Sequence, residues 1–258
     1  MKPTTTNGSS ASSRKRWRVS DSTAIANGAA AEEHHEHPPY QRHHFETIEQ
    51  QADTTNFAMW LFLLTEIMFF GGLFLAYFVY RQWYPAAFAS ASNNTDLWLG
   101  AANTTVLICS SLTMAMGVHF AALGKRMLLV TCLVLTLILG SVFLGVKAYE
   151  YHDKWVKHEV PGVHFDCRDD KGQPCLDAAH TPLFFSLYFG MTGLHASHMI
   201  IGAAILLVLI WQAYHGKFTP EWHTPVEMFG LYWHFVDIVW IFLFPLLYLI
   251  DRSAKGLS

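Results

Sequence analysis

Charged residues are scarce in this sequence. Only 14% of its 258 residues are charged and 52% are hydrophobic, whereas soluble domains carry roughly one-quarter charged residues. The formal net charge is -3, and the basic residues form no long stripe of the kind that binds nucleic acid. These absences argue against nucleic acid as a partner and indicate a chain whose main solvent is not water.

Catalytic signatures are missing as well. The sequence has no Ser/His/Asp arrangement, no Walker-type loop and no Cys-pair metal spacing. Of its four cysteines, Cys109 and Cys132 lie inside apolar runs, while Cys167 and Cys175 share one polar segment. Only Cys167 and Cys175 are placed to form a disulfide, and the chain offers no strong catalytic constellation of its own.

Long hydrophobic runs are what the sequence has instead. Five apolar stretches of roughly 20 residues or more can each cross about 30 Å of hydrocarbon, because a helix rises about 1.5 Å per residue. Trp and Tyr side chains cluster near their ends, where amphipathic rings prefer to lie. We predict an all-α fold, a polytopic membrane helix bundle over residues 51–258 with five transmembrane helices near 57–80, 97–122, 127–149, 182–214 and 227–249.

Residues 1–50 have a different composition. They are rich in Ser, Thr, Ala, His and charge and have few large apolar side chains, so we predict a flexible N-terminal tail. A solvated, low-complexity tail is the simpler interpretation of its histidines, although they could chelate a transition metal. These are His34, His35, His37, His43 and His44.

A polar loop over residues 152–181 separates the third and fourth spans. Lys125 and Arg126, between the second and third spans, favour a cytoplasmic side for that connection and for the N-terminus, although the basic residues of the 152–181 loop weigh against it. We expect a cytoplasmic N-terminus, with this loop and the C-terminus on the opposite side. An oxidising compartment there would allow a Cys167–Cys175 disulfide.

Glu66 is an ionisable residue in the middle of the first span. A carboxyl group at this depth costs free energy, so it is expected to be neutral or hydrogen-bonded. The functional interpretations are a proton relay or a subunit contact. The structural alternative is a neutral acid bonded to a neighbouring helix.

His195 and His198 are three residues apart in the fourth span, so they share a helix face and could in principle both reach a metal. The alternative is that both form hydrogen bonds across helices or to lipid. His119 and His234 are the obvious intramembrane additions, too few for several haems and copper. We therefore expect no metal and no redox cofactor on this chain.

The fifth span has a polar and aromatic face. Tyr232, Trp233, Asp237 and Trp240 recur at three- and four-residue spacings, and such a face packs against protein rather than lipid. It predicts a docking or lipid-headgroup surface, with ordinary packing inside the bundle as the alternative.

Four motifs in a fixed order resemble the cytochrome c oxidase subunit III family. They are Trp60–Gly71, Leu139–Tyr151, Thr192–Gly202 and Tyr232–Phe242, and the match extends over nearly everything from His43 to Ile250. The family also occurs with seven spans, and this chain resembles its bacterial five-span form.

The resemblance implies a non-catalytic subunit III of a proton-pumping haem-copper oxidase in a bacterial inner membrane. Oxidase subunits I and II would be its partners and would hold the haem and copper, a respiratory supercomplex is compatible with this, and phospholipid would be bound structurally. Glu66 matches the family's intramembrane carboxylate near the proton-uptake side. Further residues match polar positions inside the bundle, at subunit or lipid contacts: Glu150, His195, His198, Glu227, Trp233, His234 and Asp237.

Two other functions remain open from the sequence. The same type of subunit occurs in quinol oxidases and as a nitric-oxide-reductase-associated homologue, although Glu66 within its motif favours the cytochrome c branch. A different class is a stand-alone proton-coupled transporter that uses Glu66 and Asp237 as a relay. A transporter would function without partner subunits and often contains an internal repeat, which the sequence does not show.

Overall fold

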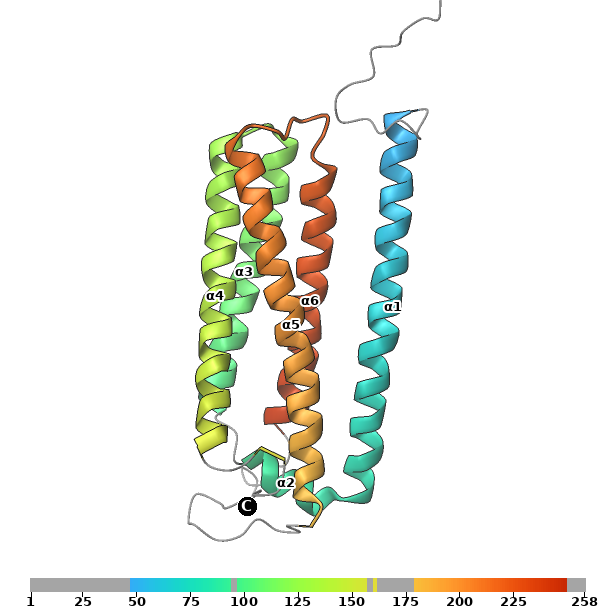
Figure 1. Ribbon diagram of the computed structural model, residues 1–258, viewed down its shortest axis with the longest axis vertical. Coiled ribbons are helices and arrows are strands. Elements are labelled where there is room, and N and C mark those ends of the chain that lie inside the picture. The colour runs from blue at the N-terminus through green and yellow to red at the C-terminus, as the bar shows by residue number, and fades with distance from the viewer. Residues whose placement is uncertain (1–46, 94–96, 157–159, 162–178, 250–258) are drawn as a thin grey trace, which may run out of the picture. The chain divides into compact units, whose positions relative to one another are not determined.

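The computed structural model describes residues 47–93, 97–156, 160–161 and 179–249. These residues form helices and no β-strand (Figure 1). The predicted all-α fold is therefore confirmed. The helices are α1 (Ile48–Trp83), α2 (Pro85–Asn93), α3 (Leu97–Ala122), α4 (Arg126–Val156), α5 (Thr181–Tyr214) and α6 (Thr224–Tyr248).

Five of these helices are long and apolar enough to cross a membrane, namely α1, α3, α4, α5 and α6. The five expected spans are thus present. The first and third are longer than expected, because α1 begins at Ile48 inside the segment predicted to be a flexible tail and α4 continues to Val156, inside the segment predicted to be a polar loop. The Thr47 side chain accepts a hydrogen bond from the Gln50 N–H at 3.1 Å and so caps the helix.

Two tight helix ends are made by glycine. Gly124 and Gly216 have φ values of 66° and 70°, the left-handed region that a residue without a Cβ adopts at little cost. After each glycine, the next N–H bonds a carbonyl five residues back, from Lys125 to Phe120 and from Lys217 to Gln212. This pattern satisfies helix-end carbonyls and allows α3 and α5 to stop abruptly.

The short helix α2 was not expected from the sequence. It lies beside the ends of α5 and α6 (Figure 1). Its Ser92 hydroxyl donates to the Leu247 carbonyl at 3.0 Å, and Tyr77 of α1 donates to the Leu246 carbonyl at 2.6 Å. Carbonyls in the last turn of a helix have no partner within it, so these two hydroxyls complete the end of α6.

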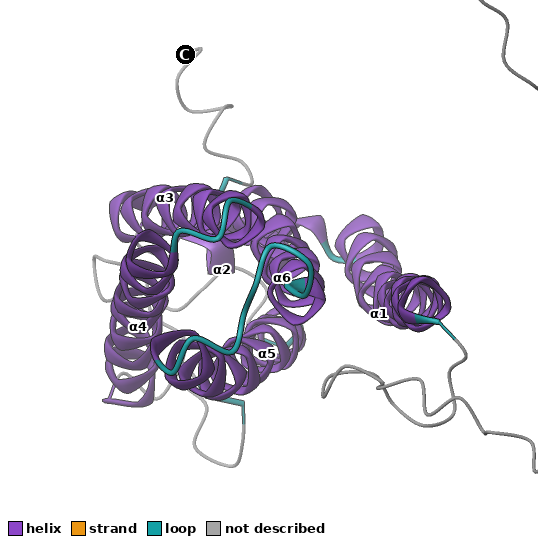
Figure 2. Ribbon diagram, turned by 90° about the horizontal axis from the view of Figure 1, so that it is seen from above, coloured by secondary structure: helices purple, strands orange, loops and turns teal. Residues whose placement is uncertain are grey.

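Helices α3, α4, α5 and α6 surround a common centre, and α1 lies outside this group beside α5 and α6 (Figure 2). In an apolar 18-residue stretch of each helix, 17% of the α1 residues are buried, against 50% of the α6 residues. Large apolar side chains such as Phe57 and Met68 of α1 are 70% and 71% exposed. Such surfaces suit lipid rather than water.

Small residues bring α4 and α5 close to Trp233 of α6. A Cβ added at Gly140 would lie 3.0 Å from the Trp233 ring, and one at Gly202 would lie 3.1 Å from it. The indole N–H donates to the Ser110 hydroxyl of α3 at 3.1 Å. Trp233 therefore packs at the centre of the four-helix group, as small residues at membrane helix contacts allow.

Candidate functional site

Glu66 of α1 lies opposite His198 of α5. The distance from Glu66 Oε2 to His198 Nε2 is 3.2 Å, within ion-pair range, although no well-formed hydrogen bond joins the two atoms. The side chains are 18% and 14% exposed. His198 Nδ1 lies 2.9 Å from the Leu194 carbonyl. Because a carbonyl only accepts, Nδ1 carries a proton, and Nε2 is the ring nitrogen that faces Glu66.

A cavity adjoins this pair. It has a volume of about 560 Å³ and lies between α1, α5 and α6. It extends from Pro225, at the start of α6, to Glu66 near the middle of α1, and Tyr232 on its wall donates a hydrogen bond to the His198 carbonyl at 2.9 Å. The remaining wall is apolar: Met59, Phe62, Ile201, Ile205, Met228 and Phe229.

His195 does not join His198. It is 1% exposed and packs against the rings of Phe143 and Trp240, with centroid distances of 5.5 Å and 5.1 Å. Neither of its ring nitrogens has a hydrogen-bond partner among the described residues. The two histidines thus have separate surroundings, His195 among aromatic rings and His198 beside Glu66. The described part of the chain contains no group of three His, Cys, Asp or Glu residues that could hold a metal.

Glu150 belongs to a buried polar network that joins α4, α5 and α6. Lys147 Nζ donates to Glu150 Oε2 at 2.7 Å and to the Tyr248 hydroxyl at 2.6 Å. The Tyr188 and Tyr248 hydroxyls both donate to Glu150 Oε1. Lys147 also lies 4.4 Å from the centroid of the Trp240 ring, a cation–π contact. Every group in this network has a partner inside the protein.

Three members of this network, Lys147, Tyr188 and Tyr248, were missed by the sequence analysis. The spacing of Lys147 and Glu150 was an available signal, because residues three apart on a helix are neighbours and opposite charges there can pair. The two tyrosines carried no comparable signal. They reach the network from other helices, and Tyr248 resembles an ordinary interfacial ring at the end of a span.

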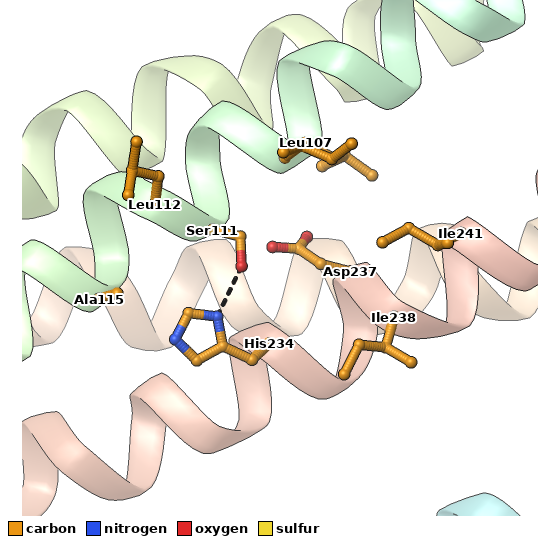
Figure 3. A pocket seen from close by; sticks show the side chains of 9 residues that line it. Leu107, Ser111, Leu112, Ala115, His234, Asp237, Ile238 and Ile241 are labelled. Atoms are coloured by element: carbon orange, nitrogen blue, oxygen red, sulfur yellow. Dashed lines mark hydrogen bonds between the residues drawn. The ribbon is translucent and has the colours of Figure 1, made fainter.

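His234 and Asp237 face α3 from α6 (Figure 3). His234 Nδ1 lies 2.7 Å from the Ser111 hydroxyl, an interaction in which either atom can be the donor. The Asp237 carboxyl group lies beside the same hydroxyl (Figure 3). It is nevertheless without a hydrogen-bond partner of its own among the described residues, and it is only 2% exposed. Both residues line a cavity of about 340 Å³ between α3 and α6.

The remaining candidate residues lie elsewhere. Glu227 is in the first turn of α6, with its side chain 43% exposed, and its Oε1 lies 3.1 Å from His223 Nε2. It is therefore at a helix end, where an acidic group is favoured, rather than inside the bundle. Cys167 and Cys175 lie outside the described residues, as do the tail histidines, so their disulfide and their metal binding stay predictions.

The helices and their buried polar groups define a multi-pass α-helical membrane protein. The sequence pattern described as Cytochrome c oxidase subunit III matches residues 35–157 and 177–251. The chain therefore belongs to the cytochrome c oxidase subunit III family.

Individual relatives agree with this assignment. The cytochrome c oxidase subunit 3 of Thermostichus vulcanus is 32% identical over 201 residues, which cover 74% of this chain and 85% of the relative. That of Synechocystis is 33% identical over 199 residues, 77% of this chain and 76% of the relative. The Gallus gallus protein is 30% identical over 218 residues, 81% of this chain and 73% of the relative.

Proposed function

We propose that this chain is the non-catalytic subunit III of a proton-pumping cytochrome c oxidase, in which it supports proton uptake, lipid binding and the stability of the catalytic subunit. The family assignment supports the subunit type, since its relatives are named cytochrome c oxidase subunit 3. The observation that carries the proton role is the Glu66–His198 pair at the inner end of a cavity between α1, α5 and α6.

The chemistry of the pair suits temporary storage of a proton. One proton can be held on Glu66 Oε2 beside a neutral imidazole or on His198 Nε2 beside a carboxylate, and the pair is neutral in both states. A change of protonation without a change of net charge avoids the cost of an isolated charge in the membrane. The cavity begins near the start of α6, on the same side as the N-terminal end of α1. With a cytoplasmic N-terminus, it would admit protons from the uptake side.

Lipid binding rests on the same cavity. Its walls are apolar apart from the Glu66–His198 pair and the Tyr232 hydroxyl, a lining that suits an acyl chain.

Haem and copper belong to the partner subunits in this proposal, and this chain binds neither. Optical and metal analysis of the purified chain tests that part, because haem bound stoichiometrically to this chain alone would contradict it.

The proton role is tested by measuring oxygen consumption over successive turnovers at matched haem content. We expect Glu66→Gln to retain most electron-transfer activity with a mild change in turnover, because oxygen chemistry takes place in another subunit. Removal of the whole chain should cause faster loss of activity during turnover and slower proton uptake. Glu221→Gln changes an exposed loop carboxyl group and serves as the matched control. Complete loss of oxygen reduction in Glu66→Gln, with normal assembly and haem content, would refute a supporting role.

A further inference from the structure

Asp237 is a buried carboxyl group without a partner. Among the described residues two acidic side chains are buried, Glu150 and Asp237. Glu150 accepts hydrogen bonds from Lys147, Tyr188 and Tyr248, whereas neither oxygen of Asp237 has a hydrogen-bond partner. A buried polar group without a partner destabilises the fold, and more so if it is charged. The fold therefore leaves this carboxyl group available to a group from outside the chain.

The surroundings of Asp237 open outward. Its carboxyl group lines the cavity of about 340 Å³ between α3 and α6, beside Ser111 and His234 (Figure 3). The cavity rim is apolar and exposed, with Ile108, Leu112 and Ile238 at 53%, 63% and 51% exposure. None of its lining residues belongs to α1. An approaching group can therefore reach Asp237 from the outer face of α3 and α6.

The depth of Asp237 restricts what can bind there. Asp237 and Ser111 lie near the middles of α6 and α3, and both helices are long enough to cross the membrane. At this depth phospholipid headgroups are out of reach and acyl chains carry no hydrogen-bond donor. A transmembrane helix of another protein can present such a donor at mid-membrane, and polar side chains of this kind hold helices together in membranes.

We propose that the α3/α6 cavity binds a hydrogen-bond-donating side chain from a transmembrane helix of another oxidase subunit, with Asp237 as the acceptor. This rests on the proposed function, which supplies partner subunits in the same membrane. A Lys, Arg, Asn or Gln side chain would suit this site, because neither Asp237 oxygen accepts a hydrogen bond from the described part of this chain. The exposed apolar rim would pack against the rest of the partner helix. The α3/α6 face is then a contact between subunits rather than a lipid-facing surface.

Photo-crosslinking in the assembled complex tests the position of this contact. A benzophenone amino acid at Leu112 or at Ile238 should crosslink to a peptide of another oxidase subunit. The same probe at Ile138 of α4, which is 53% exposed, should crosslink several-fold less to oxidase subunits. Crosslinks from the rim to lipid alone, to a small hydroxylated membrane compound such as a quinol, or to a second copy of this chain would each overturn the proposal.

Substitution of Asp237 tests the chemistry. We expect Asp237→Leu to lower the yield of co-purified oxidase subunits about tenfold, because one intramembrane hydrogen bond between helices is lost. Asp237→Asn retains an acceptor and should lower the yield less. Thr131→Val, which removes an exposed hydroxyl on α4, should leave the yield unchanged. Membrane levels and monodispersity of each variant show whether the chain itself still folds.

The outcomes separate this inference from the proposed function. If the wild-type chain co-purifies with oxidase subunits but the rim gives no crosslink to them, the contact is wrong and the proposed function stands. If no oxidase subunit co-purifies with the wild-type chain, the proposed function itself fails. An unchanged yield in Asp237→Leu would also overturn the role of Asp237, whatever the crosslinks show.

Discussion

Glu150 and Asp237 are both buried carboxyl groups, but their surroundings differ. Glu150 lies in a closed network in which Lys147, Tyr188 and Tyr248 supply every donor. Asp237 meets no donor of its own and faces a cavity that opens outward. Glu66 is intermediate, since it lies within ion-pair range of His198 and beside another cavity.

This difference separates a carboxyl group that joins helices to one another from carboxyl groups that face cavities. Membrane lipid offers no hydrogen-bond partner to a polar group, so a buried carboxyl group without a protein partner adds to the cost of folding unless something in an adjacent cavity bonds to it. The network around Glu150 joins three helices to one another. Asp237 and Glu66 take no part in that network, and the roles proposed for them both depend on what enters the adjacent cavities.

The largest expected effect follows from breaking the closed network. Lys147→Met leaves the Glu150 carboxylate buried without its cation, and we expect the free energy of unfolding to fall by about 3–5 kcal/mol. Reversible unfolding in mixed detergent and SDS micelles measures it. Lys147→Met combined with Glu150→Leu should recover most of the loss, because replacing both charges removes the unpaired group. A loss in the single variant no larger than that of an exposed ion pair, about 1 kcal/mol or less, would show that the network is not closed.

A smaller effect is expected from the loop between α4 and α5, the helices that carry Glu150 and Tyr188. The predicted Cys167–Cys175 disulfide would close a short loop worth about 2–3 kcal/mol in the free energy of unfolding. Cys167→Ser should remove that amount, and Cys109→Ser, an exposed thiol of α3, serves as the control. Intact-mass analysis with and without reductant detects the bridge. Labelling of both thiols in the unreduced native protein would show that the pair is free.

Packing around Trp233 should give the next effect. Gly140→Ala places a Cβ 3.0 Å from the indole ring, so the ring has to move and the free energy of unfolding should fall by about 1–3 kcal/mol. Gly145→Ala on the same helix meets nothing within 4 Å and should be neutral or slightly stabilising. The same unfolding measurement compares the two variants. Equal effects on the two variants would mean that the close packing of α4 against Trp233 does not require a glycine at position 140.

The number of spans could be predicted from the sequence, whereas their mutual contacts could not. Length and apolar content are enough to identify a membrane-crossing helix. Which face of that helix packs inward is harder to predict, because the lipid-facing and protein-facing sides are both apolar. Met68 and Phe70, two residues apart in one motif, are 71% and 3% exposed, and their residue types do not distinguish them.

The candidate residues show the same limit. Depth in a span was sufficient to single out Glu66 and Asp237, because ionisable residues are rare there. The partner of each depends on another helix: His198 of α5 for Glu66, and none within the described chain for Asp237. His195 and His198 were expected to share a face, but three residues span about 300° of a helix turn. The remaining offset is enough to direct one ring to the aromatic centre and the other to α1.

The smallest expected effect concerns the pair that the proposed function uses. Glu66 and His198 lie beside a cavity and are partly exposed, so their coupling should add at most about 1 kcal/mol to the free energy of unfolding. A double-mutant cycle with Glu66→Gln and His198→Gln measures that coupling, because the loss of the His198 contact with Leu194 occurs on both sides of the cycle and cancels. A coupling of several kcal/mol, comparable with that of Lys147 and Glu150, would show that the pair stabilises the fold by holding α1 to α5. A weak coupling together with altered turnover would instead show that the pair matters for turnover and contributes little to stability.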